Sequence, residues 1–263
     1  MAVAKVLSRF RAMNSPHDVQ VPREVDPVTG LPVGPLVERP GPAPFPEPRI
    51  LDGRYCRLEP IAARHRDDLF AASAGPDAAR RFRYLFDSPP ASVADIERWI
   101  AAAMASTHAV VYAVIDKASE RCEGRQQLMN IVPAHRSIEI GNIYWGPRIA
   151  RTRVASEAHF LLARHVFDDL RYRRYEWKCD ALNAASRRAA ERFGFTFEGH
   201  FRRAVINKGR TRDTTWYSII EEEWPALKRA YRQWLDPDNF DRQGKQRVRL
   251  GELTAAALAS LRR

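Results

Sequence analysis

The order of the elements expected in the middle of the chain constrains its fold more than any other feature. An apolar run ends at Gly146 and Pro147, as a strand that ends in a sharp turn does. After the turn, apolar side chains recur at three- and four-residue spacing without Gly or Pro, which predicts one amphipathic helix over residues 154–170. A strand at 175–182 and a short helix at 184–192 follow, so strands alternate with helices as in an α/β layer.

The turn between the first strand and the long helix is basic. Arg148, Arg151 and Arg153 stand directly before the helix. A helix N-terminus offers unpaired backbone N–H groups and a partial positive charge, and guanidinium groups add forked donors. An anion is therefore the natural occupant of this turn, and we expect a ligand that carries phosphate.

The rest of the chain predicts more strands than helices. Residues 108–115 form a continuous apolar run, which indicates a central strand buried on both faces. Asn207, Lys208 and Gly209 have the composition of a tight turn between two antiparallel strands. We therefore expect an α/β (α+β) fold with a mixed, largely antiparallel sheet. The other elements expected are strands at 55–59, 125–131, 137–145, 196–205 and 211–220, and helices at 62–74, 93–105 with Ser92 as N-cap, 226–235 and 252–261.

Prolines set the N-terminal segment apart from the rest. Residues 16–48 contain ten prolines, five of them on alternate positions. Proline fixes φ and removes a backbone donor, so this segment forms neither a helix nor a central strand. We interpret residues 1–48 as an arm, which is either a disordered linker or a strip along the domain surface. The domain itself is expected over 49–225, and a helical C-terminal extension over 226–263.

The formal charge of +11 is concentrated in one part of the chain. Residues 151–212 hold fifteen Lys and Arg against seven acids, whereas residues 1–48 hold five of each kind. Such an excess attracts nucleic acid, an acidic partner or a polyphosphate, or it is simply a solvated basic surface. Few aromatic side chains stand among the basic ones, so a nucleic-acid partner is the least expected of these.

Hydropathy and cysteine usage argue against a membrane protein, a disulfide-rich protein and a zinc protein. The hydrophobic fraction is 45%, and no apolar run approaches the ~20 residues that span a bilayer, so no membrane role is expected. The chain has 3 cysteines, which are scattered and lack Cys-x-x-Cys spacing. They indicate neither a disulfide framework nor a zinc site, and no metal is expected. The reducing cytoplasm is the expected compartment.

Several short motifs are each too common to indicate a family, but their order and spacing along the chain are informative when they are taken together. They are Glu139-Ile140-Gly141, Ala155-Ser156-Glu157-Ala158, Asn183 with Ser186, Phe193-Gly194-Phe195, Glu198-Gly199, and Arg212-Asp213 followed by Tyr217-Ser218. Through them, residues 50–225 resemble the GNAT superfamily of N-acetyltransferases, and within it the branch that acetylates ribosomal-protein N-termini. The resemblance implies a GNAT fold with helices on both faces of the sheet. It also implies an acetyl-CoA-dependent enzyme that acetylates a primary amine, on a protein N-terminus or a small molecule, by direct attack in a ternary complex.

For acetyl-CoA, the resemblance implies a site built mainly from backbone groups. In the family, N–H groups of a glycine-bearing turn cradle the pyrophosphate, and an N–H near the end of the preceding strand binds the thioester carbonyl. Arg151 and Arg153 stand where the family usually has glycines, so they add side-chain donors but reach left-handed backbone angles at a higher cost. The residues implied in cofactor binding are Ile143, Tyr144, Ile149, Ala150, Arg151, Thr152, Arg153, Val154, Ala155 and, toward the pantetheine arm, Asn183.

The resemblance also implies three catalytic residues. Glu139 is the candidate base for the acceptor ammonium, and its alternative role is to hold a neighbouring backbone or arginine group. Many members of the family use a tyrosine as the acid for the leaving thiolate, but that position is Ala190 here. Ser186 occupies the position of a serine in the ribosomal-type branch, with helix capping as its alternative role. Tyr217 is a second candidate acid, and its alternative is a place in the core.

Two other functions remain open on the sequence. The missing glycines and the missing tyrosine are also compatible with a non-catalytic acyl-CoA-binding or regulatory module of the same fold. The basic excess leaves a nucleic-acid-binding protein as a more remote alternative. The C-terminal extension either caps the domain or forms a contact in a homodimer.

Overall fold

The computed structural model describes residues 23–261, and the chain divides into two compact units between Gly41 and Pro42. The first unit holds a short antiparallel ladder of β1 (Glu24–Val25) and β2 (Pro32–Val33). No helix forms in the described part of the proline-rich arm, as its prolines predict, whereas nothing in the sequence predicts the ladder. The rest of that arm lies outside the described residues.

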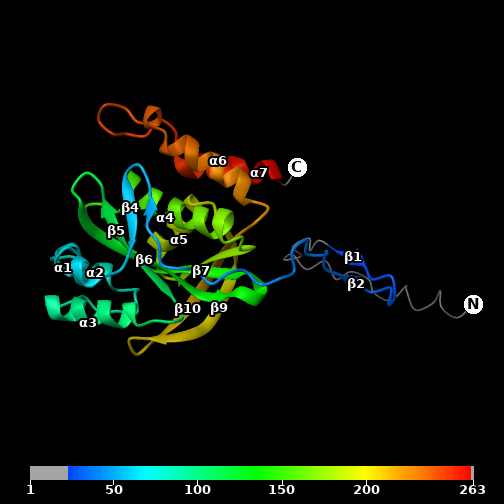
Figure 1. Ribbon diagram of the computed structural model, residues 1–263, viewed down its shortest axis with the longest axis horizontal. Helices are drawn as coiled ribbons and strands as arrows, with labels where there is room; N and C mark the ends of the chain where they lie inside the picture. Colours follow the sequence, from blue (N-terminus) through cyan, green and yellow to red (C-terminus); the bar gives the residue numbers. More distant parts are fainter. Residues whose placement is uncertain (1–22, 262–263) are drawn as a thin grey trace, which may run out of the picture. The chain divides into compact units, whose positions relative to one another are not determined.

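The second unit is built on one eight-stranded sheet (Figure 1). Neighbouring strands in it are antiparallel except β7 and β8, which are parallel. The mixed, largely antiparallel sheet that the sequence predicts is therefore confirmed. In the order in which they lie side by side, the strands are β3 (Leu51–Asp52), β4 (Cys56–Pro60), β5 (Val110–Asp116), β6 (Arg121–Val132), β7 (Ser137–Trp145), β8 (Arg174–Asp180), β10 (Arg210–Ile220) and β9 (Thr196–Asn207).

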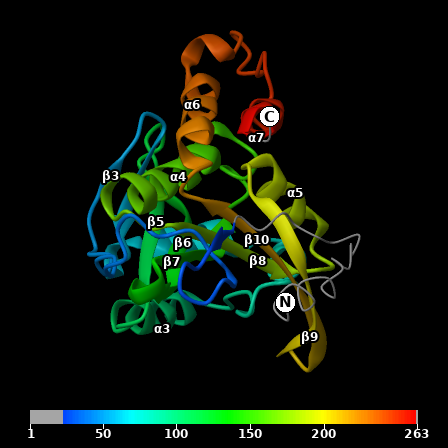
Figure 2. The ribbon, with the colours of Figure 1, turned by 90° about the vertical axis from the view of Figure 1, so that its right-hand side faces the viewer.

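Helices cover both faces of this sheet, as expected (Figures 1 and 2). The α1–α3 face carries the 3₁₀ turn η1 (Ala63–His65), α1 (Arg66–Ser73), α2 (Ala78–Arg81) and α3 (Val93–Met104). The opposite face, here the α4 face, carries α4 (Arg153–Arg164) with its π-helical continuation η3 (His165–Asp169), α5 (Ala184–Arg192), α6 (Trp224–Leu235) and α7 (Leu250–Leu261). Two further 3₁₀ turns are η2 (Pro133–His135), between β6 and β7, and η4 (Pro237–Asn239), after α6.

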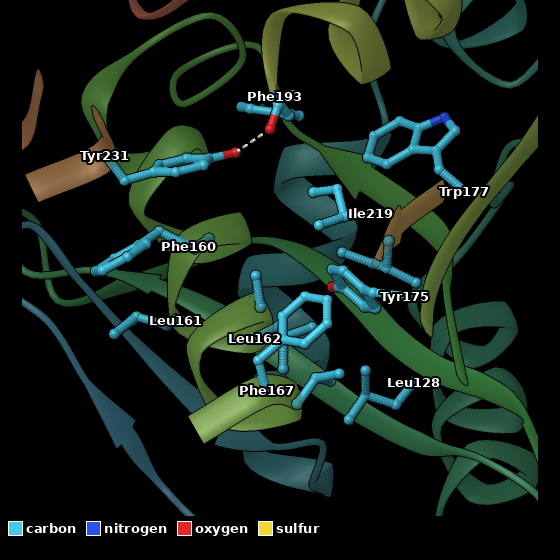
Figure 3. Close-up of a cluster of buried hydrophobic side chains, with 14 of the residues drawn as sticks. Leu128, Phe160, Leu161, Leu162, Phe167, Tyr175, Trp177, Phe193, Ile219 and Tyr231 are labelled. Carbon is cyan, nitrogen blue, oxygen red and sulfur yellow. Dashed lines mark hydrogen bonds between the residues drawn. The ribbon is translucent and has the colours of Figure 1, made fainter. Parts of the chain in front are cut away.

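Strand β5 separates two hydrophobic cores. All of residues 110–115 are buried, as their continuous apolar run predicts. The even-numbered residues of this run join the larger core on the α4 face, and the odd-numbered ones join a smaller core on the α1–α3 face. Aromatic rings dominate the larger core, where the Tyr231 hydroxyl donates to the backbone oxygen of Phe193 at 3.0 Å (Figure 3). The sheet is therefore a rigid partition between two differently packed layers.

Local sequence signals explain most of the element boundaries. The helix predicted over 154–170 is one continuous helical segment, which changes from α to π geometry at His165. Ser92 is the N-cap of α3, and Asp95 accepts from its backbone N–H at 2.9 Å. At the hairpin tip, Lys208 and Gly209 have φ of 51° and 72°, as a two-residue turn of this kind requires. Strand β3 and helix α2 are not predicted by any pattern in the sequence.

A buried carboxylate fixes the start of α4 against the beginning of the sheet. Glu157 accepts from the backbone N–H groups of Arg54 at 2.8 Å, Tyr55 at 2.6 Å and Cys56 at 2.8 Å. Hydrogen bonds to an ionised acceptor are stronger than neutral ones, so these three hold the helix firmly. A Cβ at Gly53 would lie 2.6 Å from the Glu157 carboxylate, so this turn needs glycine for the close approach.

The C-terminal extension packs on the α4 face of the same unit. Trp224, Tyr231 and Trp234 are buried in the larger core. The Thr254 hydroxyl in α7 donates to the backbone oxygen of Arg192 in α5 at 3.1 Å. The extension therefore caps the domain, which is one of the two roles left open by the sequence. Among the described helices, none combines the length and the apolar character needed to cross a membrane.

Candidate active site

The two parallel strands separate part-way along their length. β7 and β8 are paired as far as Ile140 and Trp177, although β7 continues to Trp145 and β8 to Asp180. Beyond that point β7 remains paired with β6, and β8 with β10. The sheet is therefore open between the carboxyl ends of two parallel strands. Ligands of α/β sheets typically bind at such carboxyl ends.

A β-bulge lies on β7 beside this opening. Asn142 and Ile143 stand opposite the single residue Gln126 of β6, and Asn142 has φ of 46°. A bulge leaves one residue out of the ladder and turns its backbone groups in a new direction. The backbone N–H groups of residues 142–144, which are expected to bind a carbonyl oxygen, therefore lie at the edge of the opening.

The basic turn leads from the bulged strand into α4. Arg151 has φ of 67°, so this arginine takes the left-handed conformation that glycine adopts more easily. Thr152 is the N-cap of α4, and its hydroxyl accepts from the backbone N–H of Val154 at 3.2 Å. The backbone N–H groups of Arg151, Arg153 and Ala155 have no hydrogen-bond acceptor among residues 23–261. Three free donors at the N-terminus of a long helix form a suitable seat for a diphosphate.

Two of the three arginines in this turn are engaged by protein partners. The Arg148 side chain lies 2.9 Å from the buried carboxylate of Glu123. The Arg153 guanidinium lies 4.7 Å from the ring centre of Tyr55 and 4.7 Å from that of Phe240. An anion at the turn would therefore be held mainly by backbone N–H groups, with the exposed Arg151 side chain beside them.

A fourth arginine, which no motif in the sequence indicates, approaches the same helix. Arg192, the last residue of α5, donates to the Ser156 hydroxyl at 3.0 Å, and its guanidinium lies 4.9 Å from the ring centre of Trp234. Burial lowers the pKa of this guanidinium, and no carboxylate in the described part of the chain pairs with it. Arg192 is therefore a further candidate for contact with an anion near the first turns of α4.

A comparison with models of protein families shows to which family the chain belongs. A family model described as "Acetyltransferase (GNAT) domain" matches residues 56–196. The chain belongs to the GNAT acetyltransferase family. The resemblance noted in the sequence is thereby confirmed, and with it the GNAT fold.

Solved structures of GNAT proteins agree with this assignment. A GCN5-related N-acetyltransferase from Brucella melitensis is 55% identical, with 82% of this chain and 98% of that chain covered and a TM-score of 0.80. A probable acetyltransferase from Chromobacterium violaceum is 38% identical, with 74% and 98% covered and a TM-score of 0.70. An acetyltransferase from Salmonella typhimurium that modifies the N-terminal serine of a 50S ribosomal subunit protein is 20% identical, with 65% and 99% covered and a TM-score of 0.58, and shows the fold alone. A comparison with curated proteins gave no match.

Glu139 of this GNAT domain lies on the α1–α3 face at the start of the opening. Its neighbours Ile138 and Ile140 belong to the larger core, so the alternation of the strand places Glu139 on the opposite face. The Asn130 side chain donates to Glu139 Oε2 at 2.7 Å, and Lys178 Nζ lies 2.8 Å from the same oxygen. Burial raises the pKa of Glu139, while Lys178 and Asn130 oppose the rise. Oε1 has no partner among residues 23–261, so one oxygen of this carboxylate is available.

Lys178 belongs to the site, although no motif of the family indicates it. Its ammonium lies 2.8 Å from Glu176 Oε2 and 3.9 Å from the ring centre of Trp216. Burial acts to lower the pKa of Lys178, but Glu139 and Glu176 outweigh burial and raise it. The alternation of polar residues along the strand predicted at 175–182 was the signal that could have revealed it, because Glu176 and Lys178 share a face.

Asn183 and Ser186 lie on the other side of the opening, at the N-terminus of α5. Asn183 is the N-cap, and its side-chain oxygen accepts from the backbone N–H of Ser186 at 3.1 Å. The Ser186 hydroxyl accepts from Trp177 Nε1 at 3.0 Å. Trp177 is the last residue of β8 paired with β7, so Ser186 is tied directly to the point of separation.

Tyr217 lies on the same face of the sheet as Ser186 but deeper in the protein. It pairs with Trp177 across β10 and β8 and is fully buried. Its hydroxyl donates to Glu191 of α5 at 3.2 Å. Burial raises the pKa of Tyr217, so its proton is held more tightly than that of a free tyrosine. The structure thus brings Ser186 closer than Tyr217 to the open strand ends.

Several residues implied in cofactor binding can act only through their backbone. The Tyr144 hydroxyl donates to the backbone oxygen of Ala72 at 2.8 Å, and its ring packs on Phe82 at 4.7 Å. Ile149 is 1% exposed and belongs to the larger core. These side chains fix the strand and the turn in place, while their N–H and C=O groups stay near the opening. Within residues 23–261, no group of three or more His, Cys, Asp or Glu is arranged to hold a metal ion.

The hairpin tip is tied to the loop between α2 and α3. Lys208 Nζ donates to the backbone oxygen of Phe82 at 2.8 Å and to that of Asp87 at 2.7 Å. The resemblance implies that the connection 75–92 lies on the acceptor side, and these contacts hold its residues 82–87 beside the start of β10. We call the contacts of Lys208 with Phe82 and Asp87 the hairpin strap.

Proposed function

We propose that this GNAT protein transfers the acetyl group of acetyl-CoA to a primary amine, by direct attack of the amine in a ternary complex. The observation that carries the proposal is the opening between β7 and β8, with Glu139 on one face and Ser186 on the other. Side chains on both faces of such an opening would let a donor and an acceptor meet in a fixed orientation.

The residues present fit the polyphosphate end of acetyl-CoA. The free backbone N–H groups of Arg151, Arg153 and Ala155 would hold the diphosphate at the N-terminus of α4. Arg192 stands nearby without a carboxylate partner among the described residues. The Asn183 side-chain amide would donate to the pantetheine arm. Acetyl-CoA supplies an activated acyl group in the form of a thioester.

The bulge and Glu139 would act on the acyl carbon and the amine. Backbone N–H groups of residues 142–144 would donate to the carbonyl oxygen, where negative charge develops. An α-amine has a solution pKa of about 7.7–8.0 and a lysine amine about 10.4, so a proton must leave at neutral pH. Glu139 Oε1 would receive that proton, and the raised pKa of this buried carboxyl makes it a better base than an exposed one.

Ser186 would act on the sulfur. Its hydroxyl accepts a hydrogen bond from Trp177, so its own proton would be donated, and the thioester sulfur would compete for it with the neighbouring Cys179 side chain. Tyr217 stays a second candidate for this role, although its hydroxyl already donates to Glu191. The cap formed by Asn183 fixes the turn on which Ser186 lies.

Two acceptor classes belong to the proposal, a protein N-terminus and a small molecule. The Salmonella typhimurium acetyltransferase modifies an N-terminal serine, and it shares the fold at 20% identity. Peptides with an N-terminal serine are therefore suitable first acceptors, together with small primary amines.

The experiment combines a binding measurement with a screen of acceptors. We expect calorimetry with coenzyme A to give a saturable isotherm, and thiol release from acetyl-CoA to depend on an added amine. Ser186→Ala is expected to lower turnover by about 10²-fold and Asn183→Ala to weaken coenzyme A binding, whereas the exposed Ser260→Ala in α7 serves as control.

Three outcomes separate the alternatives. An absence of heat with coenzyme A would remove the proposed function. Binding without thiol release over the whole panel would favour a non-catalytic acyl-CoA-binding module. Unchanged rates in both Ser186→Ala and Asn183→Ala would leave acetyl transfer standing but remove this assignment of the site.

A further inference from the structure

Three hydrogen-bond donors on the α1–α3 face are buried and unused. Arg125 Nη1, Arg212 Nε and Thr214 Oγ1 have no hydrogen-bond partner among residues 23–261. Arg125 lies under Trp99 of α3, with its guanidinium 4.0 Å from the ring centre, and Arg212 lies 4.7 Å from the ring centre of Phe86 in the α2–α3 loop. Leaving a buried polar group unpaired is costly, so an arrangement of this kind points to a ligand.

Arg212 is the member of this group with no counterion. The residue is 8% exposed, and no carboxylate in the described part of the chain lies within ion-pair distance of it. The nearby acids are otherwise occupied: Asp87 pairs with Arg125, Asp213 accepts from the backbone N–H of Arg203, and Asp180 accepts from that of Leu182. A buried guanidinium without a paired charge is unfavourable, so the natural partner of Arg212 is an anion from outside the chain.

The charge balance reverses at the other end of the same face. Around Glu139, three carboxylates, Glu139, Glu176 and Glu198, share two cations, Lys178 and Arg174, so negative charge is in excess there. That end therefore favours a cation, as an acceptor amine is before it loses its proton. Arg212 lies four positions along β10 from Trp216, whose ring covers Lys178. At about 3.3 Å per residue, Arg212 and Trp216 are roughly 13 Å apart along the strand, and the Lys178 ammonium over the Trp216 ring also contacts Glu139.

We propose that the acceptor is an amine that also carries a carboxylate, which Arg212 binds while the amine lies at Glu139. The guanidinium presents parallel N–H donors that match a carboxylate, and Thr214 adds a hydroxyl donor beside it. The spacing along the strand equals about three residues of extended chain plus the length of an acidic side chain, so an acidic residue near a peptide N-terminus fits, as does an elongated amino acid. This inference rests on the proposed function, because it uses Glu139 as the site of the amine.

The test compares acceptors that differ only in the carboxylate. One series uses N-terminal serine peptides with Asp or Asn at the third position, and the other uses small amino acids and their amides. We expect kcat/KM of the wild type to favour the acid over the amide by about 10- to 100-fold in one of the two series, which identifies the source of the carboxylate.

Variants of Arg212 test whether this residue carries the preference. In Arg212→Gln, the ratio of kcat/KM for the acid to kcat/KM for the amide is expected to fall to about one. Arg212→Lys keeps the positive charge but loses the parallel N–H donors of the guanidinium, so it is expected to retain part of the preference for the acid. This variant replaces Arg212→Gln in the test if Arg212→Gln does not fold. Arg210→Gln is the matched control, because Arg210 is exposed on the same strand two positions away, and it is expected to keep the wild-type ratio.

The outcomes distinguish this inference from the proposed function. A wild-type ratio near one in both series, or a ratio unchanged in Arg212→Gln, would overturn the inference, while thiol release with the amides would leave acetyl transfer standing. If no acceptor is turned over, the affinities of the same acid and amide acceptors for the complex of the protein with coenzyme A test the inference instead. Tighter binding of the acid that is lost in Arg212→Gln supports the inference, and equal or absent binding overturns it.

Discussion

Lys178 Nζ lies 2.8 Å from Glu139 Oε2 at the point where β7 and β8 separate. The same ammonium lies 2.8 Å from Glu176 and is covered by the Trp216 ring. Lys178 thus bridges two buried carboxylates, of which Glu176 also pairs with Arg174, and its contact with Glu139 limits how far burial can raise the pKa of Glu139. The pair therefore sets both the proton affinity of the proposed base and the stability of the sheet around it.

Replacement of the proposed base should change the pH profile as well as the rate. Glu139→Gln is expected to lower kcat/KM by about 10²-fold. A base acts only when deprotonated, so wild-type kcat/KM should fall as the pH drops through the raised pKa of Glu139, above the ordinary value of about 4.3. Measured over pH 5–9, this acidic limb should be absent from the variant. An identical limb in both proteins would show that another group is the base.

Replacement of Lys178 should move the acidic limb of the pH profile of kcat/KM to higher pH. Lys178 lowers the pKa of Glu139, so Lys178→Met leaves the buried Glu139 without its cation, while Glu176 keeps its pair with Arg174. We expect the free energy of unfolding to fall by about 3–5 kcal/mol at neutral pH. Lys117→Met, which breaks the more exposed pair with Asp52, is the control and should cost at most about 1 kcal/mol. Equal losses in urea titrations of the two variants would contradict the special role of the buried pair.

The left-handed arginine of the basic turn should be replaceable by glycine. Arg151 has φ of 67°, which costs an L-residue about 1–2 kcal/mol, while glycine loses about 0.5–1 kcal/mol more through the unfolded chain. Arg151→Gly is therefore expected to be slightly more stable than wild type. Its coenzyme A affinity should stay within about threefold, because the backbone N–H groups remain.

A control variant tests whether glycine stabilises the protein only where the backbone is left-handed. Arg188→Gly lies at an exposed position inside α5, where glycine costs about 1 kcal/mol. Thermal unfolding should shift in opposite directions in the two variants. A large loss of coenzyme A affinity in Arg151→Gly would mean that the side chain, and not the backbone, holds the anion.

The hairpin strap should control acceptor binding without affecting the cofactor. Lys208→Asn removes the ammonium that binds Phe82 and Asp87 but keeps a residue that tolerates the positive φ of the turn. We expect faster hydrogen exchange in residues 82–92 and a higher KM for the acceptor, with the dissociation constant of coenzyme A unchanged. Unaltered exchange in that loop would show that its packing, and not Lys208, holds it.

Local pattern was sufficient to predict much of the fold and the turn at which the cofactor is proposed to bind. The strand Ser137–Trp145 and the helix Ala184–Arg192 have the bounds that their apolar periodicity and turn residues predict. The turn and the start of α4 follow β7 directly in sequence, so the residues between 143 and 155 that are expected to bind the cofactor are brought together by local structure alone, whereas Asn183 at the start of α5 is not. The family assignment confirms the fold they imply.

The acceptor side could not be predicted in the same way. Lys178 meets Glu139 only because β7 and β8 pair in one particular parallel register, and Arg212 meets Phe86 only because the hairpin reaches the α2–α3 loop. Such contacts depend on long-range register, which no local pattern specifies. The left-handed backbone at Arg151 had no signal in the residue itself, because arginine is not a residue that turns of this kind select, and only the glycine usual at this position in the family pointed to it.

A buried histidine should make the protein sensitive to acid. His159 is fully buried, its ring stacks on Phe193 at 4.3 Å, and burial, reinforced by the charge of Arg192, lowers its pKa to about 3. An unfolded histidine has a pKa of about 6.5, so below that pH the unfolded state binds a proton that the folded state does not. The free energy of unfolding should therefore fall by about 1.4 kcal/mol per pH unit from this residue, between about 6.5 and 3.

His159→Phe isolates this contribution. Phenylalanine keeps the stack on Phe193, and the Tyr231 hydroxyl keeps its hydrogen bond to the Phe193 backbone oxygen at 3.0 Å. The difference in unfolding free energy between wild type and variant, from urea titrations at pH 7, 6 and 5, should shift in favour of the variant as the pH falls. The exposed His108→Gln should keep the wild-type slope. A constant difference between wild type and His159→Phe across this range would mean that His159 takes up its proton while the protein is still folded.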